Sequence, residues 1–178
     1  MASASARYHP ALIALHWIVL GLIAVAYAAM EFRDAWPKGS DTRELLKTVH
    51  YTVGLTVFLL VFARVALRLT NAAPAVTPPL PPLMNLASWG LHVALYGFMI
   101  VMPLLGWATL SAEGDPISFL GIPLPAIAPE SEDLKEVFEE THELIGKLGY
   151  ALIAAHAAAA LYHHYLRKDD TLRRMLPW

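Results

Sequence analysis

Charged residues divide the chain into four long apolar stretches joined by polar or proline-rich connections. Residues 10–30 form a run of 21 without a charge, and residues 83–110 form a run of 28. A helix needs about 20 apolar residues to cross a hydrocarbon layer. Residues 48–63 give only sixteen, but Arg64 and Arg68 follow at helical spacing and can extend their charged ends to the headgroups. Each of these three stretches can therefore form a membrane span.

The fourth stretch begins in an acidic segment. Ser131, followed by Glu132 and Asp133, is typical of a helix start with acids in the first turn. The helix is amphipathic at first and becomes fully apolar from about Lys147. The pattern predicts an all-α, integral membrane four-helix bundle, one domain of residues 1–178, with spans at about 10–30, 46–68, 83–110 and 140–166.

The connections are distinct in composition. Residues 31–47 are polar, residues 72–82 hold five prolines and should be extended, and residues 113–129 form a Gly/Pro-rich loop. A signal peptide is the competing interpretation of the first span. The apolar core of a signal peptide is only about 7–15 residues long, so we expect this span to be retained.

The distribution of Lys and Arg predicts the orientation of the chain in the membrane. With four spans both termini lie on one side, together with the proline-rich linker. That side carries seven Lys and Arg and the other carries six, and four of the seven lie in the C-terminal segment. The positive-inside rule therefore predicts cytoplasmic termini.

Composition narrows the chemistry. Of all residues, 57% are hydrophobic and 16% are charged, against about 25% charged in a soluble domain. The net charge of −2 and the absence of a basic patch exclude nucleic acid as a partner. The chain has no cysteine, which removes disulfides, thiolate iron–sulfur ligation and covalent c-type haem attachment.

The histidines fall at two depths of the predicted bundle. His142 and His156 are fourteen residues apart, 40° short of four helical turns, so they share a face and lie about 21 Å apart along the axis. By distance from the span ends, His50 matches His142 near the outer surface. His16 and His92 match His156 near the inner surface. One helix could therefore offer an axial ligand to each of two stacked haems, although depth alone does not choose two of the three inner histidines.

Two alternatives apply to these histidines. A single intramembrane histidine can simply hydrogen-bond across helices, and a transporter's proton relay also uses histidines. Such a relay usually includes an acid within the span, and the middle of these spans has none. Gly54 and Gly146 follow His50 and His142 at +4, where a bulky side chain would collide with a porphyrin. Small residues also serve ordinary helix packing, but the repeated spacing favours haem.

Four sets of motifs stand out in the chain: Ala14-Leu15-His16-Trp17, Ala29-Met30-Glu31-Phe32-Arg33, Thr141-His142-Glu143 with Leu148-Gly149-Tyr150, and Ala155-His156-Ala157-Ala158-Ala159-Ala160 with His163-His164-Tyr165. These motifs resemble those of the bacterial cytochrome b561 family, most of all its stand-alone superoxide oxidase branch. The resemblance covers essentially the whole chain. It implies a bacterial inner-membrane protein with two b-type haems that oxidises superoxide outside and reduces ubiquinone within the membrane. By the family pattern, His50 and His142 bind the outer haem, and His16 and His156 the inner one.

Further residues are candidates for substrate contacts. Superoxide is an anion, so Arg33, Arg43 and Lys47 in the outer connection are candidates for steering it. His92 and His163 are candidates for contacting a haem propionate or the quinone. The expected partners are superoxide, ubiquinone and the lipid bilayer, without an obligate protein partner. Two other functions stay open: a cytochrome b subunit of a larger dehydrogenase or hydrogenase, and a non-redox four-span protein.

Overall fold

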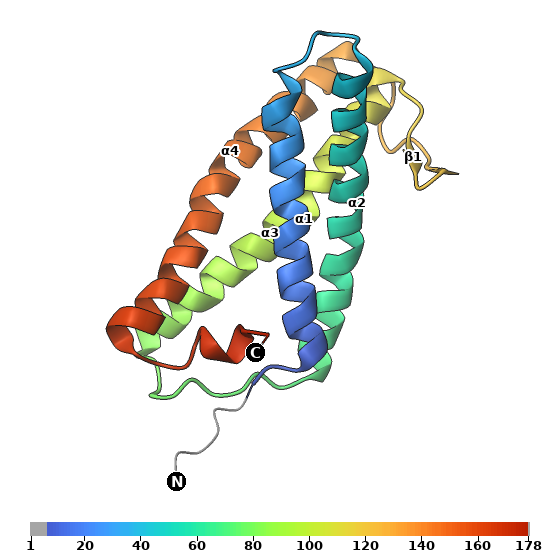
Figure 1. The fold of residues 1–178 in the computed structure, drawn as a ribbon. Coiled ribbons are helices and arrows are strands. Elements are labelled where there is room, and N and C mark those ends of the chain that lie inside the picture. The colour runs from blue at the N-terminus through green and yellow to red at the C-terminus, as the bar shows by residue number, and fades with distance from the viewer. Residues whose placement is uncertain (1–6, 178) are drawn as a thin grey trace.

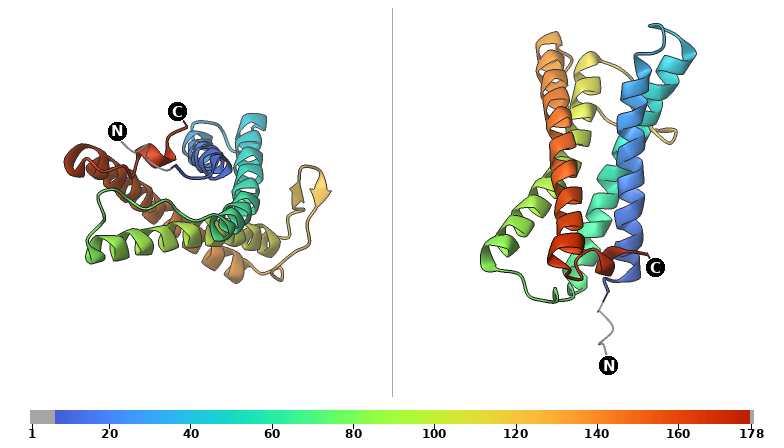
Figure 2. Two further views of the ribbon diagram at one scale, coloured as in Figure 1. Left: turned by 90° about the horizontal axis from the view of Figure 1, so that it is seen from below. Right: turned by 60° about the vertical axis from the view of Figure 1, so that its left-hand side comes forward.

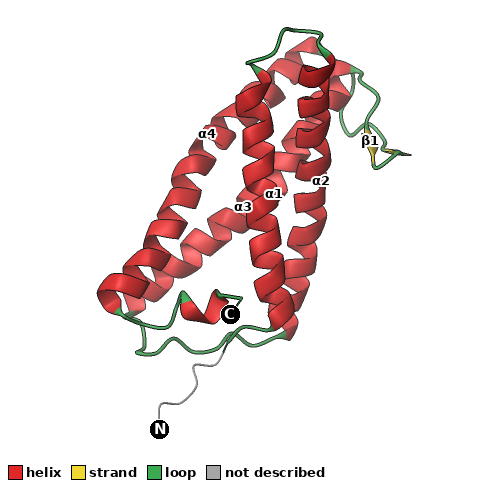
Figure 3. Cartoon of the chain, viewed as in Figure 1, coloured by secondary structure: helices red, strands yellow, loops and turns green. Residues whose placement is uncertain are grey.

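Four long helices make up most of the molecule (Figures 1 and 3). The computed structural model describes residues 7–177; residues 1–6 and 178, which belong to the predicted domain, lie outside that part. The helices are α1 (Pro10–Arg33), α2 (Asp41–Thr70), α3 (Pro82–Glu113) and α4 (Glu132–Tyr162), which continues as the π-helical turn η1 (His163–Arg167). A short 3₁₀ turn, η2 (Arg173–Met175), follows. All four helices are long and apolar enough to cross a membrane, which confirms the predicted four-helix membrane bundle.

Local sequence explains where the helices begin and end. Pro10 stands in the first turn of α1, where its missing N–H costs nothing. The Ser40 and Ser131 hydroxyls accept hydrogen bonds from the backbone N–H groups three residues on, which caps α2 and α4. Gly114 closes α3 with a φ of 77°, a left-handed conformation that glycine adopts without strain.

The helices pack in chain order. α1 lies along α2, α3 lies along α4, and α2 also contacts α3. Figures 1 and 2 show α3 and α4 inclined to the α1–α2 pair. Both ends of the described chain lie at one end of the bundle, called here the inner end, and the connection 34–40 lies at the opposite, outer end.

The interior of the bundle is small. Val19, Val57, Val61 and Met99 form its buried cluster, between α1, α2 and α3. Large apolar side chains on the outward faces remain exposed, including Ile18, Leu59 and Val101. Such surfaces suit lipid, in which apolar side chains have no reason to be buried. The chain is therefore a multi-pass membrane protein.

The two longer connections differ from each other. Residues 71–81 are extended, as predicted, and run across the inner end (Figure 1). The backbone N–H of Asp170 bonds to the Thr77 carbonyl, and the Trp17 indole N–H donates to the Met175 carbonyl at 2.9 Å, so the C-terminal segment closes this end. The loop after α3 contains a small hairpin, β1 (Ser118–Phe119) paired antiparallel with β2 (Ile122–Pro123), which the sequence did not predict.

Of the glycines in the described part of the chain, Gly149 is the one most closely approached by other helices. A Cβ added there would overlap the Tyr27 hydroxyl and lie 2.6 Å from the Phe98 ring. Overpacking a core by a methyl group costs about 1–3 kcal/mol. We expect Gly149→Ala to lower the unfolding temperature of the purified protein, measured in detergent. Gly97→Ala is the matched control, since no heavy atom lies within 4 Å of its added Cβ. Equal stability of the two variants would contradict the close contact.

Candidate cofactor sites

The first pair of histidines joins α2 to α4 near the outer end. The imidazole rings of His50 and His142 have centroids 6.0 Å apart with planes at 76°. A metal–imidazole bond is about 2 Å long and the nitrogen lies roughly 1 Å from the ring centre, so two imidazoles on one metal ion put their centroids about 6 Å apart. The spacing of this pair therefore fits one iron held between the two rings.

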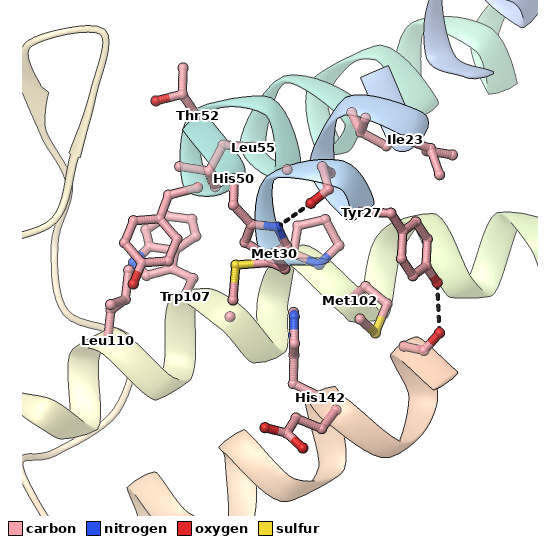
Figure 4. Close-up of a pocket in the computed structure, with 18 of the residues that line it drawn as sticks. Ile23, Tyr27, Met30, His50, Thr52, Leu55, Met102, Trp107, Leu110 and His142 are labelled. Carbon is pink, nitrogen blue, oxygen red and sulfur yellow. Dashed lines mark hydrogen bonds between the residues drawn. The ribbon is translucent and has the colours of Figure 1, made fainter. Parts of the chain in front are cut away.

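The surroundings fix the orientation of both rings. His50 Nδ1 lies 3.0 Å from the Ala26 carbonyl, which can only accept, so Nδ1 carries the proton and Nε2 is free to bind a metal. Figure 4 shows His142 pointing from α4 into the space below His50. Gly106 allows this approach, because a Cβ there would lie 3.3 Å from His142 Cε1. No sequence pattern pointed to Gly106, because the residue belongs to α3 and is far from His142 in the chain.

A cavity of about 530 Å³ surrounds this pair. Its apolar lining comes from several helices (Figure 4), with Ile23, Met30, Leu55, Met102, Trp107 and Leu110 among the residues that contribute. Gly54 also lines it and has no heavy atom within 4 Å of an added Cβ, whereas a Cβ on Gly146 would touch the Met102 methyl at 3.4 Å. An apolar cavity with two facing imidazoles is suited to a flat, mostly apolar group such as haem.

The second cluster lies toward the inner end and contains all three inner histidines of the sequence prediction. His16 and His156 have ring centroids 6.1 Å apart, and His92 and His156 have centroids 5.5 Å apart. The first distance matches the spacing expected for two rings on one iron. His92 Nδ1 lies 2.6 Å from the Ser88 carbonyl and therefore donates to it, which leaves Nε2 free on an exposed side chain.

His163 occupies a different setting. Its backbone N–H still bonds to the Ala159 carbonyl in the α-helical pattern, and the π-helical turn η1 begins here and shifts the residues that follow. Its side chain is buried, and Nδ1 lies 2.6 Å from a carboxylate oxygen of Asp169. Burial alone would raise the pKa of Asp169, but hydrogen bonds from His163, Thr171 and Arg167 outweigh it and lower the pKa to about 2. This carboxylate thus stays ionised and orients His163.

The three candidate steering cations each lie beside an acid. Arg33 and Arg43 approach the same Asp34 oxygen at 3.3 and 3.0 Å, and Lys47 lies 3.1 Å from Glu44. The Arg33 guanidinium is the main cause of the lowered pKa of Asp34, with Arg43 adding to it. Of the three cations, Arg33 lines the outer cavity. The sequence showed the cations but not these pairings.

The donor set agrees with haem rather than with a bare metal ion. Within residues 7–177, no group of three or more His, Cys, Asp or Glu side chains is arranged to hold a metal. A haem needs only two protein ligands, because the porphyrin supplies the remaining four nitrogens. Facing histidine pairs on long apolar helices are typical of one class of protein, the membrane-spanning cytochromes that hold b-type haem between two histidines.

Comparison with known proteins names the family. The family model described as prokaryotic cytochrome b561 matches residues 7–178. Cytochrome b561 homolog 1 of Escherichia coli (strain K12) is 42% identical over 172 residues, covering 96% of this chain and 97% of that protein. The probable superoxide oxidase CybB of Yersinia pestis is 32% identical over 172 residues, covering 96% of each. Cytochrome b562 of Cereibacter sphaeroides is 26% identical over 170 residues, covering 92% of this chain and 91% of that protein.

The chain belongs to the prokaryotic cytochrome b561 family. The resemblance predicted from the sequence motifs is thereby confirmed. Membership makes the chain a haem-binding membrane protein of the electron-transfer type, an oxidoreductase in the broad sense.

Proposed function

We propose that this chain is a di-haem cytochrome b, one domain of residues 1–178, that oxidises superoxide at the periplasmic face of the inner membrane and reduces ubiquinone. Both termini would lie in the cytoplasm. The observation that carries the proposal is the position of His142 and His156 on one helix, each facing a histidine of another helix at its own level. The relative named probable superoxide oxidase supports the choice of donor.

The chemistry follows from the ligand type. When bound, a haem with two histidine ligands passes single electrons through its edge and has no open position for oxygen. Reduction of one quinone takes up two electrons and two protons, so two superoxide ions are oxidised to oxygen for each quinone. The protein must therefore hold an anion outside and deliver protons near the quinone.

The chain offers residues for both tasks. We assign His16, His50, His142 and His156 to the iron ligands. Of the three candidate cations, Arg33 is the best placed to attract superoxide because it lines the outer cavity, and Arg43 and Lys47 are close by in the chain. His92 presents a free Nε2 at the inner level and is a candidate for the quinone or a propionate. His163, held by Asp169, is the second such candidate.

The rate at which superoxide reduces the haem of the purified protein should depend on the salt concentration. The Debye length falls from about 30 Å at 0.01 M to about 10 Å at 0.1 M, so a steered reaction slows over this range. Neutralising Arg33 with Arg33→Gln should slow haem reduction by a further factor of roughly 2–10, measured by stopped-flow absorbance. Lys168→Gln, which removes the same charge at the inner end, should leave the rate unchanged.

Product analysis separates this activity from dismutation. With a superoxide generator and a soluble ubiquinone, the purified protein should reduce the quinone without the hydrogen peroxide that dismutation produces. Slow haem reduction that responds neither to salt nor to Arg33→Gln would contradict the assignment of superoxide as the electron donor.

An electron-transfer subunit of a larger dehydrogenase or hydrogenase is the second candidate. Two features favour it: the steering cations are paired with acids, and the exposed start of α4 is strongly acidic. An acidic surface attracts a cationic protein donor more readily than an anion. The isolated chain distinguishes the two, because a subunit would fail to reduce quinone without its partner.

A further inference from the structure

The loop between α3 and α4 exposes an unusual amount of apolar surface. Residues 116–129 contain no charged side chain. Leu120, Ile122 and Ile127 are 74%, 63% and 47% exposed. In water such a group of side chains would be unfavourable, and contiguous exposed apolar surface usually marks a binding or membrane-contacting region.

The exposure is built into the structure. Ile117 is buried at the base of the hairpin, and the Leu124 N–H bonds to the Ile117 carbonyl at 2.9 Å. The Trp107 indole donates to the Pro125 carbonyl at 3.0 Å, and the Ile127 N–H donates to the Ser111 hydroxyl at 3.1 Å. The first bond closes the base of the hairpin, and the other two fasten the segment that follows it to the outer end of α3. The hairpin is thereby held at the end of α3 with its apolar tip exposed.

The loop also returns toward the middle of the bundle. Ile117 and Ser118 line the outer cavity together with Thr52 and Leu55 of α2. These α2 residues lie beyond Lys47, the last charge before the uncharged stretch 48–63. Figure 1 accordingly shows the hairpin beside the upper part of α2 rather than beyond its end. The base of the hairpin therefore lies at the depth of the apolar layer.

The turn residues agree with an apolar environment. Leu120 and Gly121 have φ values of 52° and 84°. A non-glycine residue with positive φ is uncommon, and Asn, Asp or Gly usually occupies such a position in a water-exposed hairpin. Here a leucine is held at the tip in a conformation that does not favour it.

We propose that the hairpin 118–123 is an interfacial anchor, with Leu120 and Ile122 inserted among the lipids of the outer leaflet. The boundary between headgroups and acyl chains suits it, because its short strands leave backbone groups that need water or headgroup partners. A protein partner is the weaker choice, since these few side chains fall well short of the roughly 800 Å² that each partner contributes to a stable interface.

Insertion of the hairpin would also affect the wall of the outer cavity. The base of the hairpin supplies Ile117 and Ser118 to the cavity wall, while its tip is held by lipid. Insertion of the tip would therefore keep this wall against α2.

Cysteine labelling tests the insertion, because the chain has no cysteine of its own. A fluorophore is attached to the cysteine of the full-length Leu120→Cys variant. The labelled protein is then reconstituted in phosphatidylcholine–phosphatidylglycerol vesicles that contain nitroxide-labelled lipids. Leu59→Cys on the exposed face of α2 is the lipid control, and Lys38→Cys in the outer connection is the water control. We expect the Leu120 probe to be quenched about as strongly as the Leu59 probe, and the Lys38 probe to remain unquenched.

Thiol reactivity provides the second measurement. A charged, membrane-impermeant reagent should modify Leu120→Cys at least roughly tenfold more slowly than Lys38→Cys in the same vesicles. Equal reactivity with no quenching would overturn the proposal. Exposure in vesicles combined with protection in native membranes would also overturn it, because a protein would then cover the hairpin.

Discussion

Replacing His142 with alanine should halve the haem content of the purified protein, from two per chain to one. His142 faces His50 across 6.0 Å, so the loss of either ring leaves this site with one histidine of the pair. His50→Ala should therefore have the same effect as His142→Ala. The pyridine haemochrome assay measures the ratio of haem to protein, and a redox titration shows which component is missing.

A matched variant controls for general damage. His164 lies next to Tyr165 at the inner end and belongs to neither pair, so His164→Ala should keep both haems. A wild-type ratio of one haem or none would refute the di-haem proposal. Loss of the inner component in His142→Ala, with the outer one kept, would show that the pairing is assigned to the wrong levels.

His16→Ala should remove the inner haem, and His92→Ala should keep it. The ring centroids of His16 and His156 are 6.1 Å apart, close to the spacing of two rings on one iron, and the family pattern assigns this pair. His92, whose ring lies 5.5 Å from His156, is the more exposed side chain, and we assign its free Nε2 to a propionate or the quinone. Low-spin haem signals in electron paramagnetic resonance give the readout. In His92→Ala we expect two low-spin signals, with at most a shift in the potential of the inner one.

The converse result would exchange the two residues. If His92→Ala lost a low-spin signal while His16→Ala retained both, His92 would be the ligand and His16 its neighbour. Each variant removes one histidine from the same inner level of the bundle, so each serves as the control for the other.

Much of the fold could be predicted from the sequence because hydrocarbon imposes a simple length requirement. Four apolar stretches, bounded by charges or by the proline-rich linker, predicted four long helices, and the structure has four apolar helices long enough to cross a membrane. Ser131, which precedes two acidic residues, correctly predicted the start of α4. Helical periodicity also placed His142 and His156 on one face, because both belong to the same rigid element.

Other features were beyond the sequence because they depend on how separate helices meet. The 6.0 and 6.1 Å ring spacings, the space beside Gly106, and the ion pair of Arg43 with Asp34 each join residues of different elements. The bond of His163 to Asp169 spans the π-helical turn η1, which helical periodicity did not predict.

The hydrophobic pattern by itself determined the four spans and the depth of each histidine, since both follow from counting residues along straight helices. Only the tertiary structure decided which imidazoles face one another and where the hairpin lies. Helix inclination and rotation set these, and they arise from side-chain packing between elements, which one-dimensional spacing does not encode.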